Sequence, residues 1–142
     1  MRVVLLVGLP GSGKSTLSKQ EFSNYAYINQ DSLGSKDNCV FLYKECLSKN
    51  MNIIVDRCNQ DKKQRKLWIN IALQYGVESV NCIYLDVNEE ECIARILSRK
   101  NHETILENFP ISKKRSIVYK MNKELELPTL DEGFSSILFM RN

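Results

Sequence analysis

Short, uniformly apolar runs alternate along the chain with longer segments in which apolar residues recur every three or four positions. The short runs predict strands at residues 2–8, 25–29, 52–56, 80–87 and 137–140. The first run is apolar throughout, which is typical of a strand buried on both faces of a sheet. Strands that alternate with helices in this way indicate an α/β domain built on a parallel sheet.

The periodic segments predict helices, of which the first ends near residue 22 and the others span about 35–49, 62–75, 88–100 and 112–125. Ser35 and Ser112 are the expected N-caps of two of them, since a serine hydroxyl accepts a hydrogen bond from the first helical turn. Asn88 and Glu91 have the spacing of a capping box, and Gly76 is suited to the end of a helix. These elements fit one domain over residues 1–142.

Composition limits the class of protein. Of the 142 residues, 43% are hydrophobic and 26% are charged, an ordinary balance for a globular domain. No apolar run approaches the roughly 20 residues of a membrane span, and the first residues lack the pattern of a secretory signal. We therefore expect a cytoplasmic or nuclear location.

The cysteines argue against covalent or metal cross-links. Their number, five, is odd, none forms a C-x-x-C pair, and one histidine, His102, is available to join them. A disulfide framework or a zinc site is therefore not expected, and small, reduced core residues are the better interpretation. Cys58 is the exception, because it falls in an expected active-site segment.

Basic residues are clustered although the net charge is only +3. The segment 57–66 holds five basic residues against one acid, and the segment 95–115 holds six against two. Such clusters would suit a polyanionic ligand. The alternative interpretation is that they are solvated faces of helices.

Residues 8–15, GLPGSGKS, match the pattern G-x-x-x-x-G-K-[ST] in full, between a predicted strand and a predicted helix. The glycines allow backbone angles at which successive N–H groups point at phosphate oxygens, and the helix N-terminus adds positive potential. We expect Lys14 to contact the β- and γ-phosphates of ATP, or of GTP, and Ser15 to ligate Mg²⁺. The expected nucleotide-binding residues are Gly8, Pro10, Gly11, Ser12, Gly13, Lys14, Ser15 and Thr16.

Acidic residues follow two of the predicted strands. Asp31 comes after the strand at 25–29, and Asp56 ends the strand at 52–56. Because the C-terminal ends of parallel strands share one edge of a sheet, both carboxylates are expected near the phosphate loop. Asp31 is the candidate general base for an acceptor hydroxyl, with a turn or a helix cap as its alternative role. Asp56 is expected to hold Mg²⁺ through water.

Arg57 and Asn59 follow Asp56 in a polar segment, and we expect both to line the groove of the acceptor substrate. For Arg57 the alternative is a surface charge that pairs with Asp61.

A pair of arginines is expected in a mobile lid around residues 95–110. Arg95 and Arg99 lie four positions apart on a predicted helix and so share one face. Two guanidinium groups there would reach the transferring phosphate and offset its developing charge; the alternative is two solvated arginines. His102 is interpreted as a surface or capping residue.

Four blocks of sequence together resemble the kinase domain of polynucleotide 5′-hydroxyl kinases, as found in polynucleotide kinase/phosphatase enzymes and related end-healing proteins. The blocks are GLPGSGKST, INQDSLGS, NIIVDRCNQDKKQRKLW and ELPTLDEGFSSI, with RKNHETI as a weaker fifth. They keep the order of the family and span nearly the whole chain. The phosphate loop is shared by many kinases, whereas NQDSLGS and LPTLDEGF are more particular.

The resemblance implies a three-layer α/β fold with a five-stranded parallel sheet in the order 2-3-1-4-5. It also implies ATP and Mg²⁺ as cofactors, and the 5′-hydroxyl end of DNA or RNA as the acceptor. Asp31 matches the family's acceptor-activating aspartate, Asp56 matches the acid that closes the third strand, and Arg95 or Arg99 matches the lid arginine.

One departure from the family concerns the acceptor phosphate. Phage members carry an arginine three residues after the base, where this chain has Gly34. Contacts to an acceptor phosphate are therefore expected from Lys36, Arg57 or Lys62.

Two other functions stay open. One is a small-metabolite or nucleoside kinase of the same fold, against which the basic clusters argue. The other is a non-catalytic nucleotide-binding module, against which the presence of both Lys14 and Asp31 argues.

Overall fold

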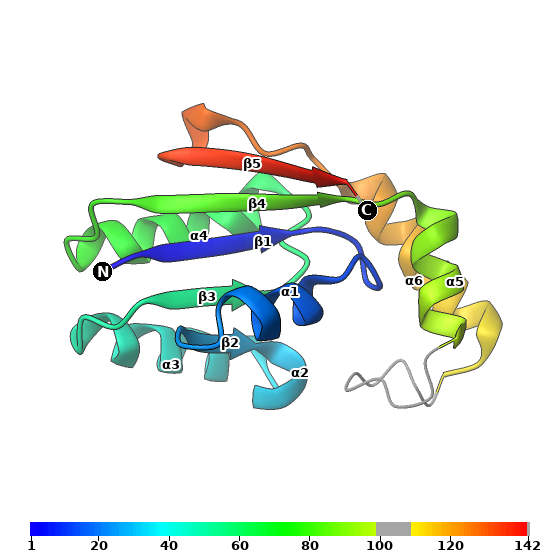
Figure 1. Cartoon of the computed structure of the whole chain (residues 1–142), viewed down its shortest axis with the longest axis horizontal. Coiled ribbons are helices and arrows are strands. Elements are labelled where there is room, and N and C mark those ends of the chain that lie inside the picture. The colour runs from blue at the N-terminus through cyan, green and yellow to red at the C-terminus, as the bar shows by residue number, and fades with distance from the viewer. Residues whose placement is uncertain (99–108, 142) are drawn as a thin grey trace.

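The computed structural model describes residues 1–98 and 109–141. Its sheet has five parallel strands in the order β2-β3-β1-β4-β5 (Figure 1), which confirms the expected fold. The strands are β1 (Val3–Val7), β2 (Ala26–Asn29), β3 (Ile53–Asp56), β4 (Val80–Asp86) and β5 (Ser136–Arg141). All strands therefore end at the same edge of the sheet, where ligands bind in open α/β folds.

Helices cover both faces of the sheet and its C-terminal edge. The helices are α1 (Lys14–Glu21), α2 (Gln30–Leu33), α3 (Lys36–Ser48), α4 (Lys62–Gln74), α5 (Glu89–Ser98) and α6 (Ile111–Glu124), and a 3₁₀ turn spans Leu130–Glu132. Helices α3 and α4 lie on one face and α1 on the other, while α5 and α6 pack together beyond the ends of the strands (Figure 1). No helix in the described ranges is long and apolar enough to cross a membrane.

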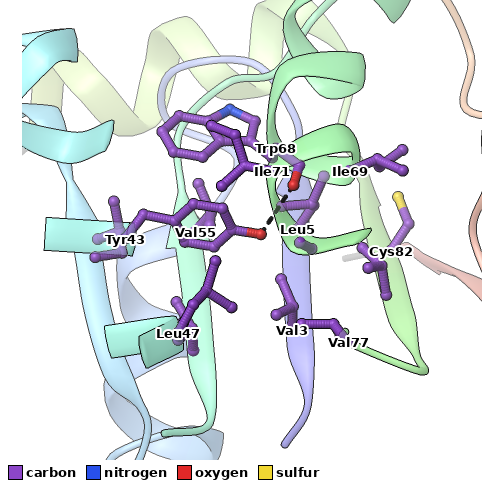
Figure 2. Close-up of a cluster of buried hydrophobic side chains, with 14 of the residues drawn as sticks. Val3, Leu5, Tyr43, Leu47, Val55, Trp68, Ile69, Ile71, Val77 and Cys82 are labelled. Carbon is purple, nitrogen blue, oxygen red and sulfur yellow. Dashed lines mark hydrogen bonds between the residues drawn. The ribbon is translucent and has the colours of Figure 1, made fainter. Parts of the chain in front are cut away.

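Strand β1 divides its side chains between two cores, because successive residues of a strand point to opposite faces. Val3 and Leu5 pack toward α3 and α4, where the fully buried rings of Tyr43 and Trp68 meet edge to face (Figure 2). The Tyr43 hydroxyl donates a hydrogen bond of 3.0 Å to the carbonyl of Trp68. This closely packed core fixes β1, and with it the start of the phosphate loop.

Most of the expected helix caps are present. The Ser35 hydroxyl accepts from the backbone N–H of Asn38 at 3.1 Å, and the Asn88 side chain accepts from the N–H of Glu91 at 2.8 Å. The expectation for Ser112 is wrong: α6 begins at Ile111, directly after Pro110. Ser112 therefore lies inside the first turn, where its backbone is already helical and its hydroxyl cannot cap the helix.

Candidate active site at the phosphate loop

The phosphate loop joins β1 to α1 and depends on glycine at two points. Gly11 and Gly13 have φ angles of 83° and 102°, a region that other residues rarely adopt. Gly13 directly precedes Lys14, the first residue of α1, so the loop runs into the positive end of that helix. The N–H of Gly8 donates to the carbonyl of Cys58 at 3.1 Å, which ties the loop to the segment after β3.

Lys14 is held inside the loop. Its side chain is largely buried, and Nζ donates to the carbonyls of Gly8 at 2.9 Å and Leu9 at 2.8 Å. Both acceptors are neutral, and no ion pair found within residues 1–98 and 109–141 includes the ammonium of Lys14. A phosphate at the loop would supply the missing negative charge.

Ser15 and Asp56 meet beside the loop. The Ser15 hydroxyl donates to Oδ2 of Asp56 at 2.9 Å, and the hydroxyl of Tyr27 donates to the same oxygen. Asp56 is almost fully buried, and the amide of Asn29 donates to its backbone carbonyl at 3.1 Å. Beside the expected phosphate site, a hydroxyl and a carboxylate would suit Mg²⁺, which binds through few protein oxygens together with phosphates and water. The sequence did not single out Tyr27.

Asp31 lies in α2, a helix of four residues that the sequence analysis missed. The side chain of Asn29 caps this helix by accepting from the N–H of Ser32 at 3.1 Å. Asp31 is exposed and lines a cavity of about 550 Å³. Lys14, Ser15 and Asp56 line the same cavity, so the expected base and the expected phosphate site share one space.

Arg57 also lines this cavity, and its partners differ from the one that the alternative interpretation named. Its Nη2 donates to Oε1 of Gln30 at 2.7 Å, and Cζ lies 5.7 Å from the centre of the Trp68 ring. Asp61, the alternative partner, instead caps α4 by accepting from the N–H of Gln64 at 2.8 Å. The surface pair with Asp61 is therefore not formed.

Asn59 has a structural position. It is fully buried with φ of 47°, and its amide donates to the carbonyl of Leu6 at 2.7 Å. Its own carbonyl accepts from Nη1 of Arg65 at 2.9 Å. Asn59 does not line the cavity, and we leave it out of the substrate contacts because its amide already supports the end of β1.

Helix α5 rests on the phosphate loop. Nη1 of Arg95 donates to the carbonyl of Ser12 at 3.3 Å, and Nε pairs with Glu91 one turn earlier at 3.1 Å. A Cβ built on Gly11 would lie 2.5 Å from the carbonyl oxygen of Cys92, so glycine also permits this close contact. Arg99 and His102, the other lid residues of interest, lie outside the described residues.

Helix α6 forms a wall of the cavity that the sequence analysis did not assign to the site. The apolar side chains of Ile117 and Met121 line it, and Lys120 and Glu124 lie on the same wall. The four-residue spacing of Ile117 and Met121 was visible in the sequence. It indicated an apolar helix face, but only the tertiary fold shows that this face borders the cavity.

Comparison with known proteins gives the family of the chain. Residues 35–128, more than half of the chain, match a family model described as an AAA domain. The chain belongs to this AAA-domain family. The match begins after the phosphate loop, so the loop motif is an independent observation.

The sequence relatives of this AAA-domain chain include the following two. It is 34% identical over 147 residues to "Transcription factor bHLH140" of Arabidopsis thaliana, which covers 96% of this chain and 16% of the relative. It is 32% identical over 140 residues to the bifunctional polynucleotide phosphatase/kinase of Schizosaccharomyces pombe, covering 95% of this chain and 32% of the relative. The chain thus spans a third or less of these proteins.

Solved structures share the fold of this AAA-domain chain. Kti12 from Chaetomium thermophilum, in complex with ADP-AlF3, has a TM-score of 0.72 and 20% identity, over 98% of this chain and 88% of that one. A fungal RNA kinase has a TM-score of 0.72 and 16% identity, over 98% and 73%. A gluconokinase from Sinorhizobium meliloti has a TM-score of 0.67 and 17% identity, over 98% of this chain and 81% of that one. The described fold is therefore a kinase-type P-loop fold.

Proposed function

We propose that this domain transfers the γ-phosphoryl group of ATP to the 5′-hydroxyl end of a nucleic acid. The observation that carries the proposal is the cavity of about 550 Å³, which is lined both by Asp31 and by residues of the phosphate loop. A carboxylate and a phosphate cradle in one space can hold an acceptor hydroxyl against the terminal phosphate of a nucleotide.

In the proposed reaction, the backbone of residues 8–16 and the ammonium of Lys14 bind the phosphates of the nucleotide. Ser15 and Asp56 hold Mg²⁺, which when bound neutralises phosphate charge. The 5′ oxygen forms a bond to the γ-phosphorus, the bond from that phosphorus to the β–γ bridging oxygen breaks, and the hydroxyl proton passes to the carboxylate of Asp31. The products are ADP and a 5′-phosphorylated end.

The proposed roles of the arginines rest on Arg95. Its contact with the carbonyl of Ser12 supports a position above the phosphates, from which a guanidinium would offset charge that develops during transfer. Arg99, four residues further on, is the second proposed lid arginine.

We also propose that residues 1–142 act as one domain with its lid around 95–110, and that GTP is an alternative donor.

The names of the relatives and neighbours support a nucleic-acid acceptor. One sequence relative is named a polynucleotide phosphatase/kinase, and one neighbour of the same fold is an RNA kinase. The gluconokinase of the same fold is the reason to test small metabolites as rival acceptors. The third function to test is a nucleotide-binding module without catalysis.

The test is an acceptor screen with ATP labelled at the γ-phosphate. Oligonucleotides of DNA and RNA with a 5′-hydroxyl end should be labelled, and nucleosides and gluconate should be labelled far more slowly. Lys14→Ala should abolish labelling, because the phosphates lose their cation. Preferred labelling of gluconate would make the chain a metabolite kinase, and ATP binding without any transfer would make it a binding module.

Asp31→Asn should lower turnover and leave ATP affinity unchanged, because the amide can still accept a hydrogen bond but cannot take the proton. Asp37, an exposed acid in the first turn of α3 that does not line the cavity, gives the matched control Asp37→Asn. Turnover is measured with saturating oligonucleotide, and ATP affinity by calorimetry. Wild-type turnover in Asp31→Asn would remove this residue as the base.

A further inference from the structure

The acceptor of a polynucleotide kinase differs from a sugar or a nucleoside by the phosphate that follows its first sugar. Position 34, three residues after Asp31, is a glycine that ends α2 with φ of 90° and offers no side chain to bind this phosphate. The sequence left three basic residues for this role: Lys36, Arg57 and Lys62. Of these, Arg57 alone is among the described residues that line the cavity.

Arg57 is held in place by neutral groups. Its Nη2 donates to Oε1 of Gln30 at 2.7 Å, and its Cζ lies 5.7 Å from the centre of the buried Trp68 ring. Nη1 is buried and has no hydrogen-bond partner within residues 1–98 and 109–141, and no ion pair found there includes Arg57. Within the part of the chain that the structure describes, no carboxylate therefore pairs with the guanidinium, and an anion in the cavity would neutralise its positive charge.

The location of Arg57 favours a contact with the acceptor substrate rather than with the phosphates of the nucleotide. Its partner Gln30 directly precedes Asp31 in α2, so the guanidinium is linked to the helix that carries the proposed base. Lys14, by contrast, is bonded to the phosphate loop itself. In a 5′-terminal nucleotide, the 5′-hydroxyl and the 3′-phosphate belong to the same sugar, so a cation near the base can reach that phosphate.

We infer that Arg57 binds the 3′-phosphate of the 5′-terminal nucleotide and so makes this domain select polynucleotide ends over nucleosides. The inference rests on the proposed function and names the feature of the acceptor that is recognised. The minimal acceptor is then a nucleoside 3′-monophosphate. A charge-assisted contact of this kind is worth roughly 10- to 100-fold in affinity.

The test compares thymidine 3′-monophosphate with thymidine as acceptors. The wild-type protein should prefer the phosphorylated acceptor in kcat/KM by about 10- to 100-fold. Arg57→Gln should lose most of this preference through a higher KM for thymidine 3′-monophosphate, with kcat nearly kept, and Arg57→Lys should keep part of it. Lys63→Gln removes an equal charge from an exposed residue of α4 outside the cavity lining and should behave as wild type.

A binding measurement gives a second readout that does not depend on turnover. Trp68 is the single tryptophan of the chain and lies under Arg57, so its fluorescence should change when thymidine 3′-monophosphate binds. The dissociation constant from this titration should rise about 10- to 100-fold in Arg57→Gln. Thermal unfolding of each variant shows whether it is folded, and Arg57→Lys supplies the second variant if Arg57→Gln is not.

Three results would overturn the inference. The wild type could use both acceptors equally, or Arg57→Gln could keep the preference while Lys36→Gln or Lys62→Gln loses it. In the third, Arg57→Gln would lower kcat equally for both acceptors, which would place the arginine on the transferring phosphate instead. These outcomes differ from failure of the proposed function, in which the wild-type protein labels no 5′-hydroxyl acceptor at all.

Discussion

Arginines and lysines of this domain differ in what neutralises them. Arg65, buried away from the cavity, forms a two-point pair with Glu132, with distances of 2.7 and 3.2 Å. Lys14 and Arg57, which line the cavity, bond instead to backbone carbonyls and to the neutral side chain of Gln30. Because a carboxylate partner would compete with a phosphate, this difference keeps positive charge available where anions are expected.

Arg95 is bonded to the phosphate loop, and this contact gives a prediction about turnover. Arg95→Ala should slow phosphoryl transfer by about 10³-fold, as loss of a charge-stabilising arginine does. The KM for ATP should change little, because Lys14 and the loop backbone still hold the phosphates. Single-turnover kinetics measure the effect, and Arg99→Ala is the comparison. A loss of ATP affinity with unchanged turnover would mean that Arg95 only shapes the loop.

At the scale of elements, the phosphate loop and α5 are packed together through Gly11. A Cβ at this position would lie 2.5 Å from the carbonyl oxygen of Cys92 and 2.9 Å from Cγ1 of Ile96. Gly76 has a similar φ, 75° against 83°, but a Cβ there would meet nothing within 4 Å. Alanine substitutions at the two glycines therefore distinguish the cost of backbone strain, which both share, from the cost of a clash with a neighbouring helix, which applies only at Gly11.

We expect Gly76→Ala to lower the free energy of unfolding by about 1 kcal/mol, because alanine is strained at positive φ. Gly11→Ala should cost about 1–3 kcal/mol more, since α5 must also move. It should reduce ATP affinity as well, because the loop carries the phosphate-binding N–H groups. Urea unfolding and ATP titration measure both effects. Equal losses of stability in the two variants would show that the α5 contact adds nothing.

A chain of side-chain contacts links the C-terminal 3₁₀ turn to the end of β1, at the edge of the sheet that carries the candidate active site. Glu132 in this turn pairs with Arg65, whose Nη1 donates to the carbonyl of Asn59. Asn59 in turn donates to the carbonyl of Leu6 in β1. The block LPTLDEGF is far from the phosphate loop in sequence, yet its acid supports the strand that leads into it.

Glu132→Ala should lower the free energy of unfolding by about 3–5 kcal/mol, because it leaves the buried guanidinium of Arg65 unpaired. Chemical denaturation measures the loss. The exposed pair of Arg141 with Asp86, at 3.3 Å, is the control, and Asp86→Ala should cost about 1 kcal/mol or less. Adding Arg65→Met to Glu132→Ala should recover part of the loss, and no recovery would contradict an electrostatic origin.

The sequence predicted long elements better than short ones. Apolar runs and helical periods extend over enough residues to define the five strands, whereas α2 has four residues and is held by the cap of Asn29. Lys14, Ser15 and Asp56 were predictable because a local motif and strand ends position them. The wall of α6 and the pairing of Arg65 with Glu132, 67 residues apart, depend on tertiary packing.

At the scale of the whole molecule, four of the five cysteines belong to the buried cores. Cys39, Cys46 and Cys82 lie in the core under α3 and α4, and Cys92 lies in the core between α5 and α6. Cys58, at the cavity, is only partly buried. The expectation that cysteines pack as small apolar residues therefore agrees with their positions, and Cys58 differs as expected.

These buried thiols predict a loss of stability in alkali. Burial raises the pKa of Cys82 to about 12 and that of Cys92 to about 11, from an ordinary 9.0. Because the folded-state pKa lies above the unfolded-state value, the stabilisation is fully present below about pH 9. It is lost as the pH rises toward 12, since the unfolded chain releases protons that the folded protein retains.

We expect the free energy of unfolding, measured in urea, to fall between pH 8 and pH 10.5. Cys82→Ala removes one of the buried thiols with a raised pKa. The variant should be less stable at pH 8, because it leaves a small cavity, but its free energy of unfolding should fall less steeply with pH. Comparing how steeply the free energy of unfolding falls with pH in the wild type and in the variant separates the effect of thiol titration from the effect of lost packing. An unchanged slope in Cys82→Ala would assign the alkaline loss to other groups, such as Tyr84, whose pKa burial also raises.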